Sequence, residues 1–213
     1  MSKLYAALLG AVLLQSVPAA ADGQVPIRPT SVSWARGVPH VSFSALDFAT
    51  KSVAEKLGSG LPQRIVTRVY AYPEGGEQPI AVAALSCRVV YDLWEGVYRV
   101  EEQTEAHDRS RTIGELSGVL HGCLDVRSVG VGSAELFARF RGRRIYFAVI
   151  IELNPLSPDV VQRIRRWLSK AGSGQLRGDA FFGSFVSIFV SRRMGSAERS
   201  SSFRSVSTIV PPP

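Results

Sequence analysis

Hydrophobic and polar residues alternate through the middle of the chain, and this pattern predicts strands joined by short turns. Residues 63–72 and 80–93 are rich in β-branched and aromatic residues and are joined by Pro73-Glu74-Gly75-Gly76, which predicts a hairpin. Residues 97–105 follow the turn Glu95-Gly96 and complete an antiparallel meander. Further strands are predicted over residues 38–43, 144–153, 184–192 and 201–210.

Other segments carry the apolar period of amphipathic helices: residues 44–57, 112–123, 134–140 and 157–170. Ser44 with Asp47, and Thr112 with Glu115, have the spacing of a helix capping box. The strand over 144–153 is apolar on both faces, so we expect it to be the most buried. The pattern predicts an α+β fold: an antiparallel sheet or partly closed β-sandwich with helices packed on one face.

The first 21 residues have the order of a secretory signal peptide. Lys3 precedes an apolar run from Leu4 to Val17, which is too short for a comfortable bilayer span. Pro18 follows, and Ala19-Ala20-Ala21 then offers the small residues that signal peptidase requires, which predicts cleavage before Asp22. No cysteine follows that could carry a lipid. We therefore expect an exported protein, periplasmic or extracellular.

The rest of the chain is expected to form one domain. Residues 22–30 contain two prolines and are predicted to be an N-terminal linker, and residues 211–213 a disordered tail. Between them, residues 31–210 are long enough for a single α+β domain with a sizeable core.

Charge is unevenly distributed. Residues 22–138 hold 11 Lys and Arg against 14 Asp and Glu, whereas residues 139–213 hold 13 against 4. A basic final third favours an anionic partner such as phospholipid headgroups, a wall polymer or an acidic protein, and export makes nucleic acid an unsuitable partner. The candidate anion-binding residues are Arg163, Arg166, Lys170, Arg192 and Arg193. Alternatively, the apolar stripe of the helix that bears Trp167 docks on the sheet while its basic residues reach solvent.

The two cysteines, Cys87 and Cys123, are both predicted to face the core from their strand and helix. Export would place them where disulfides persist. A bond between them would close a loop of about 37 residues, worth roughly 3–4 kcal/mol in the chain-entropy model. The alternative is a pair of separate buried thiols, and the sequence leaves both open.

Catalytic and metal motifs are absent from the sequence. The three histidines, His40, His107 and His121, have no G-x-S-x-G elbow or zinc-ligand spacing around them. The acidic cluster from Glu101 to Asp108 fits a solvated strand end better than a carboxylate pair or a calcium loop. We therefore expect no catalytic residue, no metal and no cofactor.

Four stretches in the middle of the chain carry a family resemblance: Leu46-Asp47-Phe48 leading into a helix, Ser59-Gly60-Leu61-Pro62 before a strand, Val90-Tyr91-Asp92 through Tyr98-Arg99-Val100, and the helix from Thr112. Together they resemble the exported bacterial family catalogued as domain of unknown function 4390, over roughly residues 38–153. The resemblance implies an envelope location and a compact exported domain, and it supplies no catalytic residues.

These observations predict a non-enzymatic exported envelope protein that acts as an interaction or accessory module. Its partner would be an envelope protein or an anionic membrane or wall surface. Two alternatives stay open: binding of anionic lipid or polymer through the basic final third, and a hydrolase whose site has no local motif.

Overall fold

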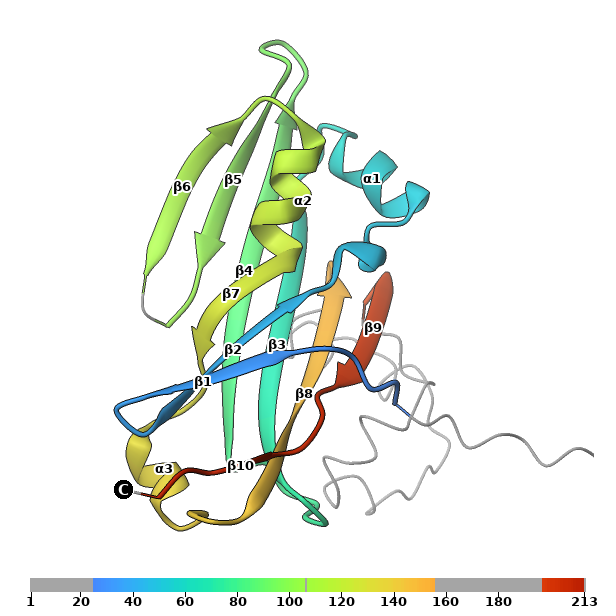
Figure 1. Ribbon diagram of the computed structural model, residues 1–213. Helices are drawn as coiled ribbons and strands as arrows, with labels where there is room; N and C mark the ends of the chain where they lie inside the picture. Colours follow the sequence, from blue (N-terminus) through green and yellow to red (C-terminus); the bar gives the residue numbers. More distant parts are fainter. Residues whose placement is uncertain (1–24, 106, 156–196, 213) are drawn as a thin grey trace, which may run out of the picture.

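Two antiparallel sheets form the framework of the protein, shown in Figure 1 as a computed structural model that describes residues 25–105, 107–155 and 197–212. The larger sheet has the order β10-β8-β3-β4-β5-β6, with β9 also paired to β8, and the smaller has the order β1-β2-β7. The strands of the larger sheet are β3 (Gln63–Pro73), β4 (Ala81–Asp92), β5 (Val97–Gln103), β6 (Asp108–Ile113), β8 (Arg144–Leu153), β9 (Arg199–Arg204) and β10 (Thr208–Ile209). Those of the smaller sheet are β1 (Ser31–Ala35), β2 (Val38–Ser44) and β7 (Asp125–Gly130).

Strand β3 lies at the centre of the larger sheet, paired with β4 on one side and β8 on the other. Its alternating residues Ile65, Thr67 and Val69 are buried, as the two-residue period of a strand requires. The predicted β3–β4 hairpin and the meander through β5 are confirmed. Strand β8 is also confirmed, with buried residues on both faces.

The smaller sheet and the helices lie on the same face of the larger sheet (Figure 1). The helical segments are η1 (Leu46–Phe48), α1 (Lys51–Leu57), α2 (Leu116–Leu124) and α3 (Ala134–Ala138). Side chains from both sheets and all of these segments form one contiguous core. Phe43 of the smaller sheet meets Phe203 of the larger one edge-on, with ring centroids 5.4 Å apart.

The structure therefore has the expected α+β composition and antiparallel pairing, but neither sheet is closed. Three strands, β1, β6 and β7, were not predicted from the sequence. Strand β6 is an edge strand with largely exposed residues, so it lacks the apolar alternation that marks a half-buried strand. Strand β7 holds a bulge opposite β2, which interrupts its period.

The predicted capping boxes are wrong. The first expected helix divides into η1 and α1 because Thr50, with φ −65° and ψ 168°, is extended between them. Thr112 belongs to β6, and Glu115 instead occupies the N-cap of α2 without a side-chain capping bond. Apolar spacing alone thus located α2, whereas the capping motif placed its start too early.

The ends of the described chain lie against β9 and β8. Residues 26–28 of the expected linker exchange backbone hydrogen bonds with Arg204, and the Arg28 guanidinium lies over the Phe203 ring. Val210, at the end of the expected domain, is buried. Within the described ranges, no helix is both long and apolar enough to cross a membrane.

Candidate functional site

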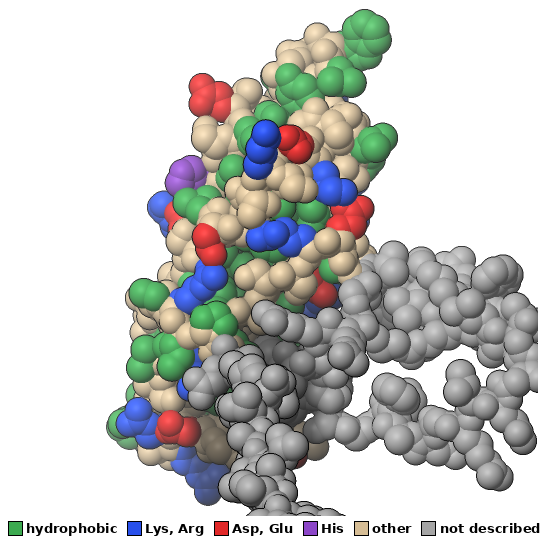
Figure 2. Space-filling model, turned by 90° about the vertical axis from the view of Figure 1, so that its right-hand side faces the viewer, with side chains coloured by type: hydrophobic (Ala, Val, Ile, Leu, Met, Phe, Trp, Pro, Cys, Tyr) green, Lys and Arg blue, Asp and Glu red, His purple; other side chains and the backbone are tan. Residues whose placement is uncertain are grey.

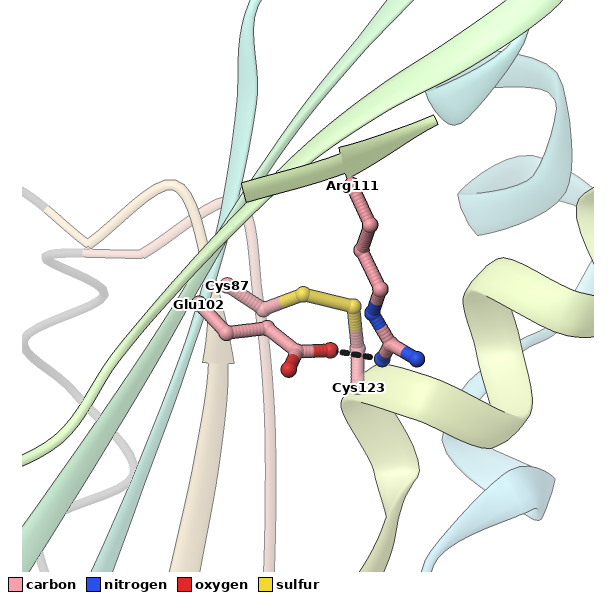
Figure 3. Close-up of a disulfide and its surroundings, with 4 residues drawn as sticks. All are labelled: Cys87, Glu102, Arg111 and Cys123. Carbon is pink, nitrogen blue, oxygen red and sulfur yellow. Dashed lines mark hydrogen bonds and ion pairs between the residues drawn. A yellow bond between two sulfur atoms is a disulfide. The ribbon is translucent and has the colours of Figure 1, made fainter. Parts of the chain in front are cut away.

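A disulfide joins the larger sheet to α2. Cys87 on β4 and Cys123 on α2 have Cα atoms 5.8 Å apart and are bonded to each other (Figure 3). Both residues are buried, at 5% and 8% exposure, so the predicted inward direction of each side chain is confirmed. Of the two possibilities that the sequence left open, the structure has the bridge.

An ion pair lies directly beside this disulfide. Glu102 on β5 accepts a hydrogen bond from the Arg111 guanidinium, which reaches from β6 toward α2 (Figure 3). Gly122 of α2 leaves room for this pair, because a Cβ there would meet the guanidinium and would lie 3.3 Å from Glu102 Oε1. Only 17% of the Glu102 side chain is exposed, so Arg111 supplies the charge that a half-buried carboxylate needs.

The acidic cluster is therefore divided between two environments. Glu101 points to the opposite face of β5 from Glu102 and pairs with Arg88 across the strands at 2.9 Å. The prediction of a solvated strand end holds for Glu105 and Asp108, which are exposed, but is wrong for Glu102.

A cavity of about 510 Å³ opens next to the disulfide, between the larger sheet and β7. We call it the disulfide cavity. Its apolar walls are Ile65, Ala83, Leu85, Cys87, Cys123, Val126 and Val129. Its polar lining comes from His40, Thr67, Ser86, Glu102, Gln103, Thr104, Glu105, His107, Asp125, Arg127 and Ser128. The sequence did not predict this cavity, because it brings the β3–β4–β5 meander together with β2, α2 and β7, which lie elsewhere in the chain.

One wall of the cavity is the bulge in β7. The β2–β7 register shifts between Val41 and Phe43, and Ser128 takes the left-handed conformation with φ 55°. Its backbone N–H donates to Ser42 Oγ at 2.9 Å. His40 Nδ1 lies 3.2 Å from Ser128 Oγ and 3.3 Å from its carbonyl oxygen. His40 and Ser42, both on the neighbouring strand β2, thus hold the β7 bulge in place.

The turn between β5 and β6 supplies the facing rim. His107 donates its backbone N–H to Thr104 Oγ1 at 3.1 Å, and its Nδ1 lies 3.2 Å from the same oxygen. The third histidine, His121, is on α2 and does not line the cavity. Two of the three histidines therefore line the cavity, one from β2 and one from the β5–β6 turn, a placement for which the sequence gives no local signal.

No group of three or more His, Cys, Asp or Glu residues with metal-binding geometry occurs in the described parts of the chain. The candidate anion-binding residues Arg163, Arg166, Lys170, Arg192 and Arg193 lie outside the described residues. Within the described part of the basic final third, Arg139, Arg141 and Arg143 are exposed and form no ion pair with another described residue.

A scan against models of known protein families finds no match to this chain, and searches of curated proteins and of solved structures also find no significant match. The resemblance to domain of unknown function 4390 accordingly stays a prediction.

Proposed function

We propose that this chain is a non-enzymatic accessory protein of a bacterial-type cell envelope, and that the disulfide cavity is its binding site. Export rests on the order of the first 21 residues, from Lys3 through the apolar run to Ala21. The Cys87–Cys123 bond fits an oxidising compartment. The observation that carries the binding role is a cavity of about 510 Å³, in the size range of ligand sites.

The lining of the cavity indicates the class of ligand. Its apolar walls favour an apolar group, while Glu102 and Asp125 are already paired with Arg111 and Arg127. A second charged partner for these two carboxylates is therefore not required, and the third carboxylate of the lining, Glu105, is exposed to solvent. His40, Gln103 and Ser128 offer hydrogen bonds at the rim. This arrangement suits an apolar ligand with a polar, uncharged end.

The cavity can be tested with an uncharged apolar fluorescent dye such as Nile red. Ala83→Leu adds a side chain within the cavity and should weaken dye binding by about tenfold, as loss of roughly 1.4 kcal/mol implies. Val82→Leu, on the same strand but 45% exposed and outside the cavity lining, is the matched control. Val129→Phe fills the space from the facing wall, and equal dye binding by all three variants would refute the cavity as the site.

Export can be tested separately, so that its failure is distinguishable from failure of the binding site. A bacterial host making the full chain should yield a mature form that begins at Asp22, as measured by intact mass. The mature form should have no thiol that reacts with an alkylating agent under denaturing conditions until it is reduced. Recovery of the complete chain in the cytoplasm with two reactive thiols would contradict the envelope location.

A second candidate, a hydrolase, is favoured by one observation. Ser128 in its strained conformation has Oγ 3.2 Å from His40 Nδ1 on the cavity wall, which is the spacing of a nucleophile and its base. Because the same nitrogen also lies 3.3 Å from the Ser128 carbonyl oxygen, a protonated Nδ1 would instead brace the bulge. Covalent labelling of the native protein, but not of Ser128→Ala, by a fluorophosphonate probe would favour the hydrolase over the accessory protein.

A further inference from the structure

Three large hydrophobic side chains stand exposed at one end of the molecule. Leu61, before β3, is 66% exposed, and Leu93 and Trp94 of the β4–β5 turn are 68% and 98% exposed. The two loops touch, because a Cβ on Gly60 would lie 2.9 Å from Leu93 Cδ1. We call these three residues the apolar tip; the turn projects in Figure 1, and hydrophobic side chains protrude at the same end in Figure 2.

The turn is built to keep Trp94 exposed. Asp92 Oδ1 accepts hydrogen bonds from the backbone N–H groups of Trp94 and Glu95, at 3.0 and 3.1 Å. These backbone bonds, followed by the Arg99 side chain, lower the pKa of Asp92 below its ordinary value. Arg99 also pairs with Glu95 at 3.0 Å. Because the backbone of the turn is held in this way, less backbone freedom is lost when Trp94 makes a contact.

The opposite end of the molecule carries a complementary hollow. A depression of about 520 Å³ lies between the β3–β4 turn and α3, at the other end of β4 from the apolar tip. Its half-buried apolar lining consists of Pro73, Pro79, Ile80, Leu136 and Phe140. Arg139 and Arg143 stand at its edge together with Glu77, and neither arginine forms an ion pair with another described residue. We call this the arginine hollow.

We propose that the apolar tip of one copy of this chain inserts into the arginine hollow of a second copy. Trp94 and Leu93 would cover the apolar lining, where a tryptophan is a frequent energetic centre of an interface. Glu95, whose side chain is 62% exposed, would face Arg139 and Arg143. Asp92 and Glu95 both pair with Arg99, so these three side chains have a net negative charge. This charge is complementary to the arginines of the hollow.

The same charge argues against a lipid bilayer as the occupant. Insertion of Trp94 would carry the neighbouring Glu95 carboxylate toward the hydrocarbon, which is costly, and anionic headgroups would repel it. A second copy offers both an apolar lining and guanidinium groups. Because tip and hollow are different surfaces at opposite ends, the contact is heterologous and joins copies head to tail.

Sedimentation velocity of the chain without its leader, residues 22–213, measures this contact. The average sedimentation coefficient should rise between about 5 and about 500 µM, a range that spans weak association. Trp94→Glu, and separately the double change Arg139→Glu with Arg143→Glu, should each weaken association by about 30-fold or more, as loss of a hot spot does. Arg109→Glu on β6 and Ile27→Ala are matched controls that should leave association unchanged, because both side chains are exposed away from the tip and the hollow.

Mixing the two defective variants gives the decisive result. The Trp94→Glu chain keeps an intact hollow and the double arginine variant keeps an intact tip, so the mixture should form pairs that extend no further. Association that the double arginine change leaves intact would mean a tip-to-tip contact, and association that mixing does not restore would mean that the two surfaces do not meet; either result would overturn the proposal. It would also be overturned by a native chain that stays monomeric at every concentration, or that floats with phospholipid vesicles through Trp94. The disulfide cavity takes no part in this contact, so either proposal can fail alone.

Discussion

Backbone strain in the described residues is concentrated at three non-glycine positions, Arg36, Ser128 and Asn154, with φ of 50°, 55° and 48°. Asn154 ends β8, where its side chain accepts from the Arg64 backbone N–H and donates to Gln63 Oε1. The sequence identified that end correctly because Pro155 has no N–H to continue the strand ladder and because asparagine tolerates a positive φ. Arg36 and Ser128 carry no comparable signal, so the bulge of the candidate site could not be predicted from residue type.

Tyr72 provides a pH-dependent prediction at the residue scale. Burial, and then the neighbouring Tyr146 and Tyr70, raise the pKa of Tyr72 from 10.0 to about 12. The unfolded chain loses this proton first, so the free energy of unfolding is unaffected by Tyr72 below pH 10 and falls as the pH rises from 10 toward 12.

Urea unfolding at pH 9 and pH 11 measures the effect. The Tyr72→Phe variant should lose less stability between these pH values than the native chain does. Part of the loss should remain in the variant, because the pKa values of Tyr70 and Tyr146 are also raised. An equal loss in both proteins would show that Tyr72 ionises as easily in the folded state as in the unfolded state.

Among the secondary-structure elements, periodicity predicted those that bury one face. Strands β3, β4 and β5 and helix α2 were located in this way, because their apolar residues recur every second residue or every third and fourth. Strand β8 was located instead by its continuous apolar run, because it has buried residues on both faces. Strand β6 was missed because its charged residues protect an open sheet edge. The sequence placed both cysteines on inward faces, but the pairing needed the packing of α2 against the larger sheet, which is a tertiary property.

The disulfide gives the prediction at this scale. Replacing both Cys87 and Cys123 by alanine should lower the free energy of unfolding by about 4 kcal/mol, because the unfolded chain regains the freedom of a loop closed over a sequence separation of 36. Urea unfolding measures this loss, and a reductant should destabilise the native chain but leave the double variant unchanged. Identical curves for the native chain with and without reductant would contradict a structural role for the bond.

At the scale of the whole molecule, one core joins the two sheets. Phe203 of β9 has no exposed surface and meets Phe43 of the smaller sheet. It comes from the end of the chain, whereas Phe43 comes from the beginning. This long-range junction could not be predicted, because sequence pattern shows which face of a strand is buried but not which distant strand will cover it.

Phe203→Ala should therefore destabilise the whole fold by about 3–5 kcal/mol, as truncation of a fully buried aromatic ring does. Val206→Ala, two residues beyond β9 and 65% exposed, is the control and should change stability by less than about 0.5 kcal/mol. Urea unfolding of both variants at neutral pH checks the comparison. A small effect of Phe203→Ala would indicate that the two sheets unfold independently.

The position of β3 between β4 and β8 has a consequence for biosynthesis. Strand β4 follows β3 after a short turn, but β8 begins at Arg144, about seventy residues beyond the end of β3 at Pro73. A chain that emerges N-terminus first would display the free hydrogen-bonding edge of β3 until β8 arrives. An unpaired central strand is the kind of template on which nascent chains aggregate. Protection of this edge of β3 during synthesis would therefore matter most while residues 74–143 are emerging.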